Sequence, residues 1–225
     1  MTASALVAPL RVVLFDLDGT LVDTAPDLAE SLAALCRSLN QPMPDFEGWS
    51  RRVPEGAKAM IEYALGPQPK EQLERHLEFF LAHYRQHCFV HSQIFPGVQE
   101  MLKGLRALGL SLAVVTNKQL GLAESVLSQS GLSPYFECVI GGDSTPAPKP
   151  APQPVLMACE LLGQSVENAL LVGDDERDCL AASRAGTRFL FAGWGYSQLS
   201  SSVPELEMLE SATDLIPRCK REAWL

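Results

Sequence analysis

The chain has 225 residues, 47% of them apolar, and is therefore long enough to bury a sizeable core as one large domain or as a medium domain with a small insertion. Its formal net charge of −9 argues against a nucleic acid or an anionic membrane as a partner, because either needs clustered lysine and arginine. No apolar run approaches the roughly 18 residues of a membrane span, residues 1–9 lack the positive charge of a signal peptide, and the six cysteines form no CxxC pair. We therefore expect a cytoplasmic protein with reduced thiols.

Five short apolar runs predict the strands of a sheet. They lie at 12–15, 112–115, 138–140, 170–172 and 189–191. Apolar residues with helical spacing fill the segments between the last four runs. Strands that alternate with helices predict an α/β fold, a doubly wound parallel sheet with helices on both faces.

The first gap between strands is too long for a simple crossover. Roughly 95 residues separate the first two predicted strands, whereas a crossover needs only about a dozen. Helical spacing in this part of the chain predicts helices at 27–39, 56–65 and 70–87, followed by one at 96–107. We therefore predict that a second, helix-rich unit is inserted between about residue 22 and about residue 95.

Two carboxylates follow the first predicted strand. Asp16 and Asp18 come directly after the apolar run at 12–15 and are separated by one residue. Open α/β sheets bind their ligands at the carboxyl ends of their strands, which is where these acids should lie. Because the chain turns there, the two side chains need not point the same way, and we expect them to take different roles around one cation.

Polar residues also follow the other predicted strands. They are Thr116, Asn117 and Lys118 after the second strand, Lys149 in a proline-rich loop, and Asp174, Asp175 and Asp178 after the fourth. Hydrolysis of a phosphate ester requires groups of these kinds: a nucleophile, a proton donor, and cations that offset phosphoryl charge. Converging carboxylates also suit Mg²⁺, which prefers oxygen ligands. From the residues alone, Lys118 could either screen the acids or face solvent.

These motifs resemble those of the haloacid dehalogenase-like hydrolases, which are largely Mg²⁺-dependent phosphatases. The four family motifs read here as DLDGT at 16–20, TN at 116–117, KP at 149–150 and GDDERD at 173–178. Within the family, the continuation LVDT at 21–24 and the segment GWGY at 193–196 are most similar to the phosphoglycolate phosphatase group. The resemblance implies a Rossmann-like core domain, formed by 1–21 and 96–225, and an inserted α-helical cap domain at 22–95 that closes over the site.

The resemblance also implies roles for the acidic residues. Asp16 would be the nucleophile that becomes an aspartyl phosphate, and Asp18 would be the general acid and then the base for water. The carboxylates of Asp16 and Asp174 and the backbone carbonyl of Asp18 would hold Mg²⁺. We expect either Asp175 or Asp178 to support water or the loop backbone, with Asp178 as a helix cap.

The phosphoryl group would be bound by three further residues. The resemblance implies that Thr116 binds it through the hydroxyl, Asn117 through the backbone amide and Lys149 through its charge. Lys149 would also hold the nucleophilic carboxylate. Gly19 and Thr20 complete the first motif and are expected to support the site.

Two groups of residues in the helical insertion have alternative interpretations. Arg51 and Arg52 replace part of the glycine-rich loop that we expect in phosphoglycolate phosphatases; they could bind an acidic group of the substrate or simply be solvated. His83, His87 and His91 are spaced by four, and we interpret them as a solvated helix face rather than a metal site.

The sequence thus predicts a Mg²⁺-dependent phosphomonoesterase that acts on a small phosphorylated metabolite similar to 2-phosphoglycolate, as a monomer or homodimer. The alternative enzymes are a sugar-phosphate phosphatase, for example of N-acetylmuramate 6-phosphate, and a phosphomutase, which returns the phosphoryl group to the substrate. The non-enzymatic alternative is a phospho-accepting signalling module. It is disfavoured because such modules lack a long helical insertion.

Overall fold

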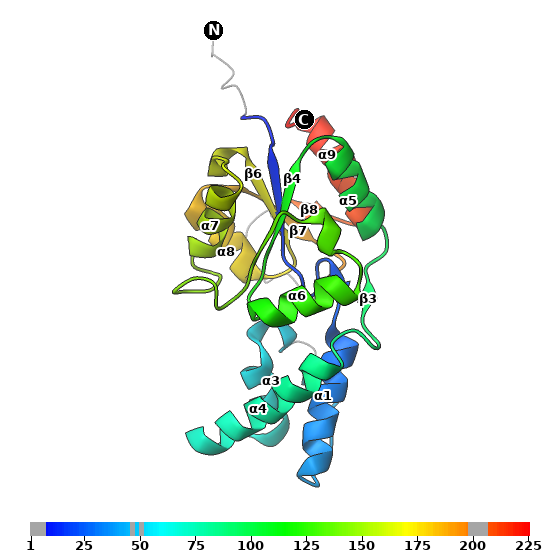
Figure 1. The fold of residues 1–225 in the computed structure, drawn as a ribbon, viewed down its shortest axis with the longest axis vertical. Helices are drawn as coiled ribbons and strands as arrows, with labels where there is room; N and C mark the ends of the chain where they lie inside the picture. Colours follow the sequence, from blue (N-terminus) through cyan, green and yellow to red (C-terminus); the bar gives the residue numbers. More distant parts are fainter. Residues whose placement is uncertain (1–7, 46–47, 50–51, 198–206) are drawn as a thin grey trace.

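A parallel sheet forms the centre of the protein (Figure 1). The computed structural model describes residues 8–45, 48–49, 52–197 and 207–225. Within these residues six strands pair in the order β5-β4-β1-β6-β7-β8, and every pair is parallel. The strands are β1 (Val12–Phe15), β4 (Ser111–Val115), β5 (Cys138–Ile140), β6 (Ala169–Gly173), β7 (Arg188–Ala192) and β8 (Met208–Leu209). The α/β fold class predicted from the sequence is therefore confirmed.

Helices cover both faces of this sheet, so its central strands are buried on two sides. Val13 and Phe15 of β1 belong to the core shared with α5, α6 and α9, whereas Val12 and Leu14 belong to the core shared with α7 and α8. The helices are α5 (Val98–Ala107), α6 (Leu120–Gln129), α7 (Gln153–Leu161), α8 (Glu176–Ala185) and α9 (Leu215–Arg221). Burial on two sides explains why β1 is a continuous apolar run without alternation.

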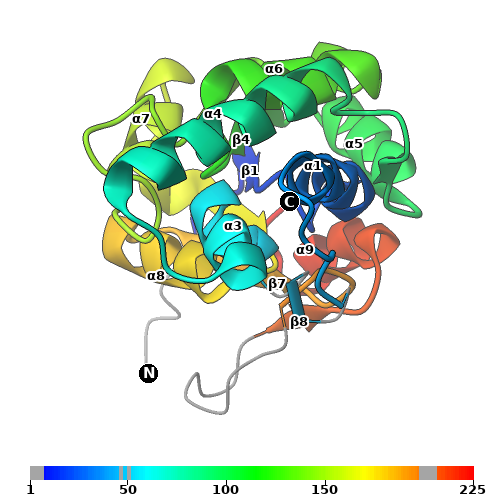
Figure 2. The ribbon, with the colours of Figure 1, turned by 90° about the horizontal axis from the view of Figure 1, so that it is seen from below.

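A helical unit lies beyond one end of the sheet, and in the view from below it crosses the ends of β1 and β4 (Figure 2). Its longer helices among the described residues are α1 (Ala25–Ser38), α3 (Ala57–Leu65) and α4 (Lys70–Gln86). The chain enters this unit through β2 (Val22–Asp23) and leaves it through β3 (Gln93–Ile94), which pair as a short antiparallel ribbon. The two connections to the sheet therefore lie side by side.

An apolar interior and one buried acid hold the helical unit together. Leu32, Ile61 and Phe80, one from each helix, are fully buried. The buried Asp27 carboxylate accepts hydrogen bonds of 2.9 Å from three successive backbone N–H groups at 90–92. This carboxylate thereby fixes the start of α1 to the segment that leads back to the sheet.

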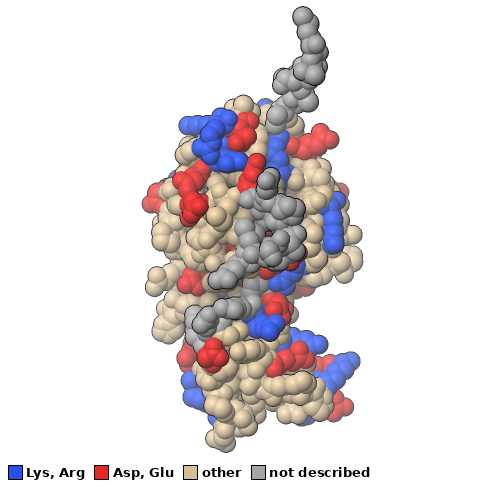
Figure 3. All heavy atoms as spheres, turned by 180° about the vertical axis from the view of Figure 1, so that it is seen from behind, with Lys and Arg blue, Asp and Glu red and all other residues tan. Residues whose placement is uncertain are grey.

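The outer surface carries charges of both signs. On the face shown in Figure 3, lysine and arginine side chains are interspersed with aspartate and glutamate. Among the described residues, no helix combines the length and the apolar content that a membrane crossing requires. All six cysteines are free thiols, as their spacing predicts.

Candidate active site

Three carboxylates from distant parts of the chain meet at the carboxyl edge of the sheet. Asp16 directly follows β1, Asp174 directly follows β6, and Asp178 lies in the first turn of α8. One carboxylate oxygen of each residue lies within 4.8 Å of the others. Asp16 and Asp174 come together because β1 and β6 are parallel neighbours that end in register. We call these three residues the acidic cluster.

The first motif fixes the position of the Asp174 carboxylate. The Thr20 hydroxyl donates to one of its oxygens at 2.8 Å, and the Tyr196 backbone N–H donates to the other at 2.8 Å. Gly19 has a φ of 82°, and a Cβ atom at this position would overlap the Asp174 carboxylate. A glycine is therefore required here both by the backbone conformation and by the close approach of the acid.

Lys149 is the cation that joins two members of the acidic cluster. Its Nζ atom lies 2.5 Å from Asp178 Oδ1 and 3.0 Å from Asp16 Oδ1, and it donates to the Val115 carbonyl at 2.7 Å. Only 3% of the residue is exposed. Burial by itself would lower the pKa of Lys149, but the two adjacent carboxylates outweigh it and raise this pKa above its ordinary value. The side chain therefore stays an ammonium ion.

The acidic cluster has more negative charge than Lys149 can offset. Burial, together with the charges of Asp16 and Asp178, raises the pKa of Asp174 well above that of an ordinary carboxyl group. Three oxygen donors with excess negative charge form a donor set that fits a hard divalent cation such as Mg²⁺. The residues present at this edge are therefore suited to the metal that the sequence predicts.

Asp175 and Asp178 together cap α8, and Asp175 rather than Asp178 takes the N-cap position. Asp175 is the N-cap of α8, where it accepts from the Arg177 backbone N–H at 2.9 Å and from Arg177 Nε at 2.6 Å. Asp178 completes the capping box by accepting from the Asp175 N–H at 3.2 Å, while its other oxygen pairs with Lys149. Asp178 therefore both supports the helix start and belongs to the acidic cluster.

The loop after β4 brings Thr116 and Asn117 to the same edge. The buried Thr116 hydroxyl accepts a hydrogen bond from the Lys118 backbone N–H at 3.2 Å. The Asn117 side chain donates to the Lys149 carbonyl at 2.9 Å, and its Oδ1 atom is buried without a hydrogen-bond partner among the described residues. Asn117 thus orients the loop that carries Lys149.

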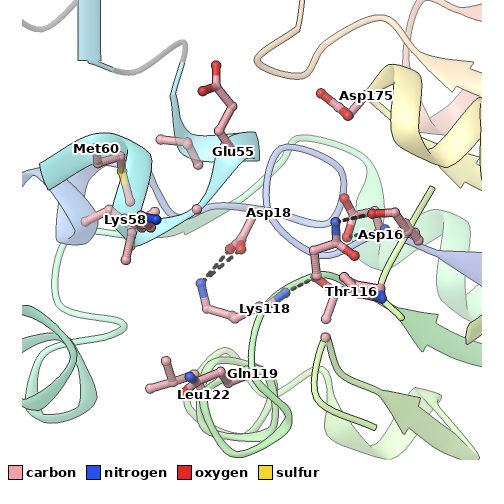
Figure 4. Close-up of a pocket in the computed structure, with 18 of the residues that line it drawn as sticks. Asp16, Asp18, Glu55, Lys58, Met60, Thr116, Lys118, Gln119, Leu122 and Asp175 are labelled. Atoms are coloured by element: carbon pink, nitrogen blue, oxygen red, sulfur yellow. Dashed lines mark hydrogen bonds and ion pairs between the residues drawn. The ribbon is translucent and has the colours of Figure 1, made fainter. Parts of the chain in front are cut away.

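Asp18 is not part of the acidic cluster, and its carboxylate contacts Lys118 (Figure 4). Lys118 Nζ lies 2.9 and 3.0 Å from the two Asp18 oxygens, and the Thr24 hydroxyl donates to Oδ1 at 2.6 Å. The same ammonium lies 4.6 Å from the centroid of the Tyr84 ring, which comes from α4. The Lys118 side chain is only 6% exposed. Of the two interpretations left open by the sequence, the one in which Lys118 faces the acids is correct.

A cavity of about 470 Å³ separates the sheet edge from the helical unit. Its sheet side includes the acidic cluster, Asp18 and Lys149. Its other side is mostly apolar, with Leu77, Phe80 and Met60 among its lining residues. Glu55 and Lys58 add charge beside the N-terminus of α3 (Figure 4). The cavity therefore combines a charged floor with an apolar wall.

Among the described residues, no arginine of the helical unit lines this cavity. Arg52 is exposed, pairs with Glu55 at 2.8 Å and lies 5.7 Å from the centroid of the Tyr63 ring. Arg51 lies outside the described residues. The surface interpretation of Arg52 is the one that fits its position.

Two of the three histidines spaced by four stack at the C-terminal end of α4. The His83 and His87 rings stack with centroids 4.4 Å apart, and His83 Nδ1 lies 3.1 Å from the Ser31 hydroxyl. Within the described residues, the acidic cluster is the one group of three or more candidate ligands close enough to hold a metal ion. The interpretation of all three as one helix face is wrong, because His87 is the C-cap of α4 and His91 lies beyond the helix.

Comparisons with known proteins find matches that cover most of the chain. The family model described as haloacid dehalogenase-like hydrolase matches residues 13–192. The chain is 37% identical over 207 residues to a phosphoglycolate phosphatase of Aquifex aeolicus, covering 92% of this chain and 95% of that protein. It is 36% identical over 197 residues to a phosphoglycolate phosphatase of Chromobacterium violaceum, covering 85% and 89%.

A solved structure has the same fold. The crystal structure described as a predicted phosphoglycolate phosphatase from Haemophilus somnus 129pt superposes with a TM-score of 0.85 at 28% identity. The superposition covers 93% of this chain and 97% of that one. The match extends over both the sheet and the helical insertion.

Proposed function

Because the chain belongs to the haloacid dehalogenase-like hydrolases, we propose that it is a Mg²⁺-dependent phosphomonoesterase whose substrate is 2-phosphoglycolate or a small ester like it. One arrangement supports this function above all others: Lys149 contacts Asp16 within the acidic cluster, at the floor of a cavity. A buried ammonium beside a partly exposed carboxylate suits a nucleophile that attacks an anionic phosphoryl group, because the cation offsets the repulsion between the two anions.

The first chemical step transfers the phosphoryl group to the protein. An Asp16 oxygen forms a bond to phosphorus while the bond from phosphorus to the leaving-group oxygen breaks. Asp18, in its protonated form, gives a proton to that oxygen, so the product leaves as an alcohol. Asp16 is then an aspartyl phosphate, and Lys149 and Thr116 bind its phosphoryl oxygens.

The second step returns the protein to its starting state. Asp18, now a carboxylate, takes a proton from a water molecule, and the resulting hydroxide attacks phosphorus. The bond between phosphorus and the Asp16 oxygen breaks, which releases inorganic phosphate. Two acids with different surroundings are therefore needed, and the structure gives Asp16 and Asp18 different cationic partners, Lys149 and Lys118.

The acidic cluster would hold the metal. The carboxylates of Asp16 and Asp174 and the backbone carbonyl of Asp18 are the ligands we propose, with Asp178 beside them. When bound, Mg²⁺ supplies positive charge that stabilises the equatorial phosphoryl oxygens. The inserted helices at 22–95, which we propose as a cap domain, would exclude water from the cavity and select the leaving group.

The direct test is a phosphate-release screen with purified protein and Mg²⁺. The esters should include 2-phosphoglycolate, hexose phosphates, N-acetylmuramate 6-phosphate and nucleotides, compared by kcat/KM. We expect the highest kcat/KM for 2-phosphoglycolate or another ester with a small anionic leaving group. Release of no phosphate from any of these esters would refute the proposed function, and isomerisation without free phosphate would indicate a phosphomutase.

A further inference from the structure

The segment 193–196, with the sequence GWGY, lies between the acidic cluster and the two connections to the helical unit. It follows β7, and the mechanism above assigns it no role. Trp194 Nε1 donates to the Thr20 carbonyl at 3.0 Å, and the Tyr196 backbone N–H donates to Asp174 at 2.8 Å. A Cβ atom at Gly195 would overlap the Asp174 side chain. The backbone of this segment is therefore packed directly against the metal side of the site.

The Tyr196 hydroxyl reaches the connections themselves. Its oxygen accepts from the backbone N–H of Thr24 at 2.7 Å and of Ala25 at 3.0 Å, and it donates to Asp23 Oδ1 at 2.8 Å. The ring centroid lies 6.4 Å from that of Phe95, which follows β3. Tyr196 therefore contacts the chain both where it enters the helical unit and where it leaves it.

These hydrogen bonds hold the start of α1, where the Ala25 N–H also donates to Asp23 Oδ1 at 3.3 Å. Thr24 is the N-cap of α1, where a threonine hydroxyl usually accepts from the backbone N–H of the second or third helical residue, and the second one here is Pro26, which has no N–H. Here the Thr24 hydroxyl makes no such bond and donates instead to Asp18 at 2.6 Å. The phenolic oxygen of Tyr196 accepts from two N–H groups at this helix start. Through the Thr24 backbone N–H, Tyr196 therefore fixes the position of Thr24 and of the hydroxyl that contacts Asp18.

We propose that Tyr196 is a positioning residue for the reaction: by capping α1, it holds the Thr24 hydroxyl against Asp18 and so fixes the general acid that serves the leaving group. This inference rests on the proposed function, in which Asp18 protonates that group. Tyr196 acts through Thr24 and is not among the described residues that line the cavity. Burial and the nearby Asp23 charge raise the pKa of Tyr196, so its hydroxyl keeps the proton that it donates.

The kinetic test uses Tyr196→Phe, which removes the hydroxyl but keeps the ring and the backbone N–H that binds Asp174. Two substrates are compared by kcat/KM, which covers only the steps up to formation of the aspartyl phosphate. For 2-phosphoglycolate, whose alkoxide must be protonated, kcat/KM should fall about 30-fold, a part of what general acid catalysis contributes. For p-nitrophenyl phosphate, whose leaving group needs no proton, it should change by less than about threefold.

Two further sets of variants separate positioning from a loss of structure. Tyr63→Phe makes the same chemical change at an exposed tyrosine and should leave both substrates unaffected. Thr24→Val should reproduce the selective loss, and the Tyr196→Phe/Thr24→Val double variant should lose no more than the larger single loss, because both act on one contact. Equal losses for both substrates, or losses that multiply in the double variant, would overturn the inference.

Amide hydrogen exchange tests the same contact without turnover. In Tyr196→Phe the amides of Thr24 and Ala25 should exchange at least about tenfold faster than in the natural protein, whereas amides in β6 should not change. Unchanged exchange at both residues would overturn the inference even if the enzyme is active. If no ester releases phosphate, the proposed function fails, and Tyr196 then has no acid to position whatever the exchange shows.

Discussion

The two sides of the cavity are built in different ways. On the sheet side, Lys149 and Asp174 are almost completely buried, and each has partners from separate segments of the chain. On the helical side, Glu55 and Lys58 are exposed and the rest of the lining is mostly apolar. Buried, paired charges keep one geometry, whereas an exposed charge is screened and mobile. The sheet side is therefore suited to hold charged groups of the substrate in one geometry, and the helical side to contact the apolar part of the leaving group.

The largest effect should come from the nucleophile on the sheet side. Asp16→Asn keeps the shape of the side chain but removes the charge that attacks phosphorus, so kcat should fall by at least about 10⁴-fold. Phosphate release from the best substrate measures this loss. Asp143→Asn is the matched control, because Asp143 also follows a strand, β5, but is not among the described residues that line the cavity.

Near-normal activity of Asp16→Asn would show that another residue is the nucleophile. Mass spectrometry must first exclude deamidation of the new amide, which would restore the natural carboxylate.

The second largest effect should come from Lys149. Lys149→Met removes the cation between Asp16 and Asp178, and kcat/KM should fall about 10²- to 10³-fold, as for other electrostatic stabilisers. Breaking this buried pairing should also lower the free energy of unfolding by about 3–5 kcal/mol without Mg²⁺. Urea denaturation measures the second effect, and Lys103→Met, at an exposed position of α5, is the control. A loss below tenfold in rate would leave Lys149 with a structural role alone.

The position of a residue relative to the strands decides whether the sequence could assign it to the site. Asp16, Asp174 and Lys149 could be assigned to one site because parallel strands end at a common edge, so residues after each strand are brought together. The pairing of Asp178 with Lys149 could not, because it depends on how α8 is capped and directed. Tyr196 was not predicted to reach Thr24, since no spacing in the chain relates them.

The length of a strand decides whether the sequence predicts it. The five predicted strands are all present because each carries at least three consecutive apolar residues. The strands β2, β3 and β8 have two residues each and show no pattern, so they could not be predicted from the sequence. The short ribbon of β2 and β3 is nevertheless what joins the two sides of the cavity.

The stabilisation of the sheet side by Mg²⁺ should depend on pH. The pKa of Asp174 is raised in the folded protein, so without Mg²⁺ the stability that this group contributes is lost as pH rises from the unfolded value of about 3.9 toward the raised pKa. Because Mg²⁺ binds the carboxylate form, it should raise the melting temperature more at about pH 8 than at about pH 5. Differential scanning fluorimetry measures both shifts.

Asp174→Asn is the control for this effect, because it removes the charge and keeps the shape. Its melting temperature should respond little to Mg²⁺ at either pH. A Mg²⁺ shift in the natural protein that is the same at both pH values would contradict the assignment of Asp174 as a ligand.

The smallest effects should come from the two lysines that line the cavity away from the acidic cluster. Lys118 is nearly buried between Asp18 and the Tyr84 ring, so a carboxylate on the leaving group can pair with it in a poorly solvated place. Lys118→Met should therefore lower the preference for 2-phosphoglycolate over an ester of an uncharged alcohol about tenfold, while Lys58→Met, at an exposed lysine, should lower it less than about threefold.

The ratio of kcat/KM values for the two esters removes any effect of Lys118 on Asp18 that both substrates share. Lys118→Arg, which keeps the charge, should restore most of the preference. A larger loss for Lys58→Met would show that the exposed charge of the helical side, rather than the buried one of the sheet side, recognises the leaving group.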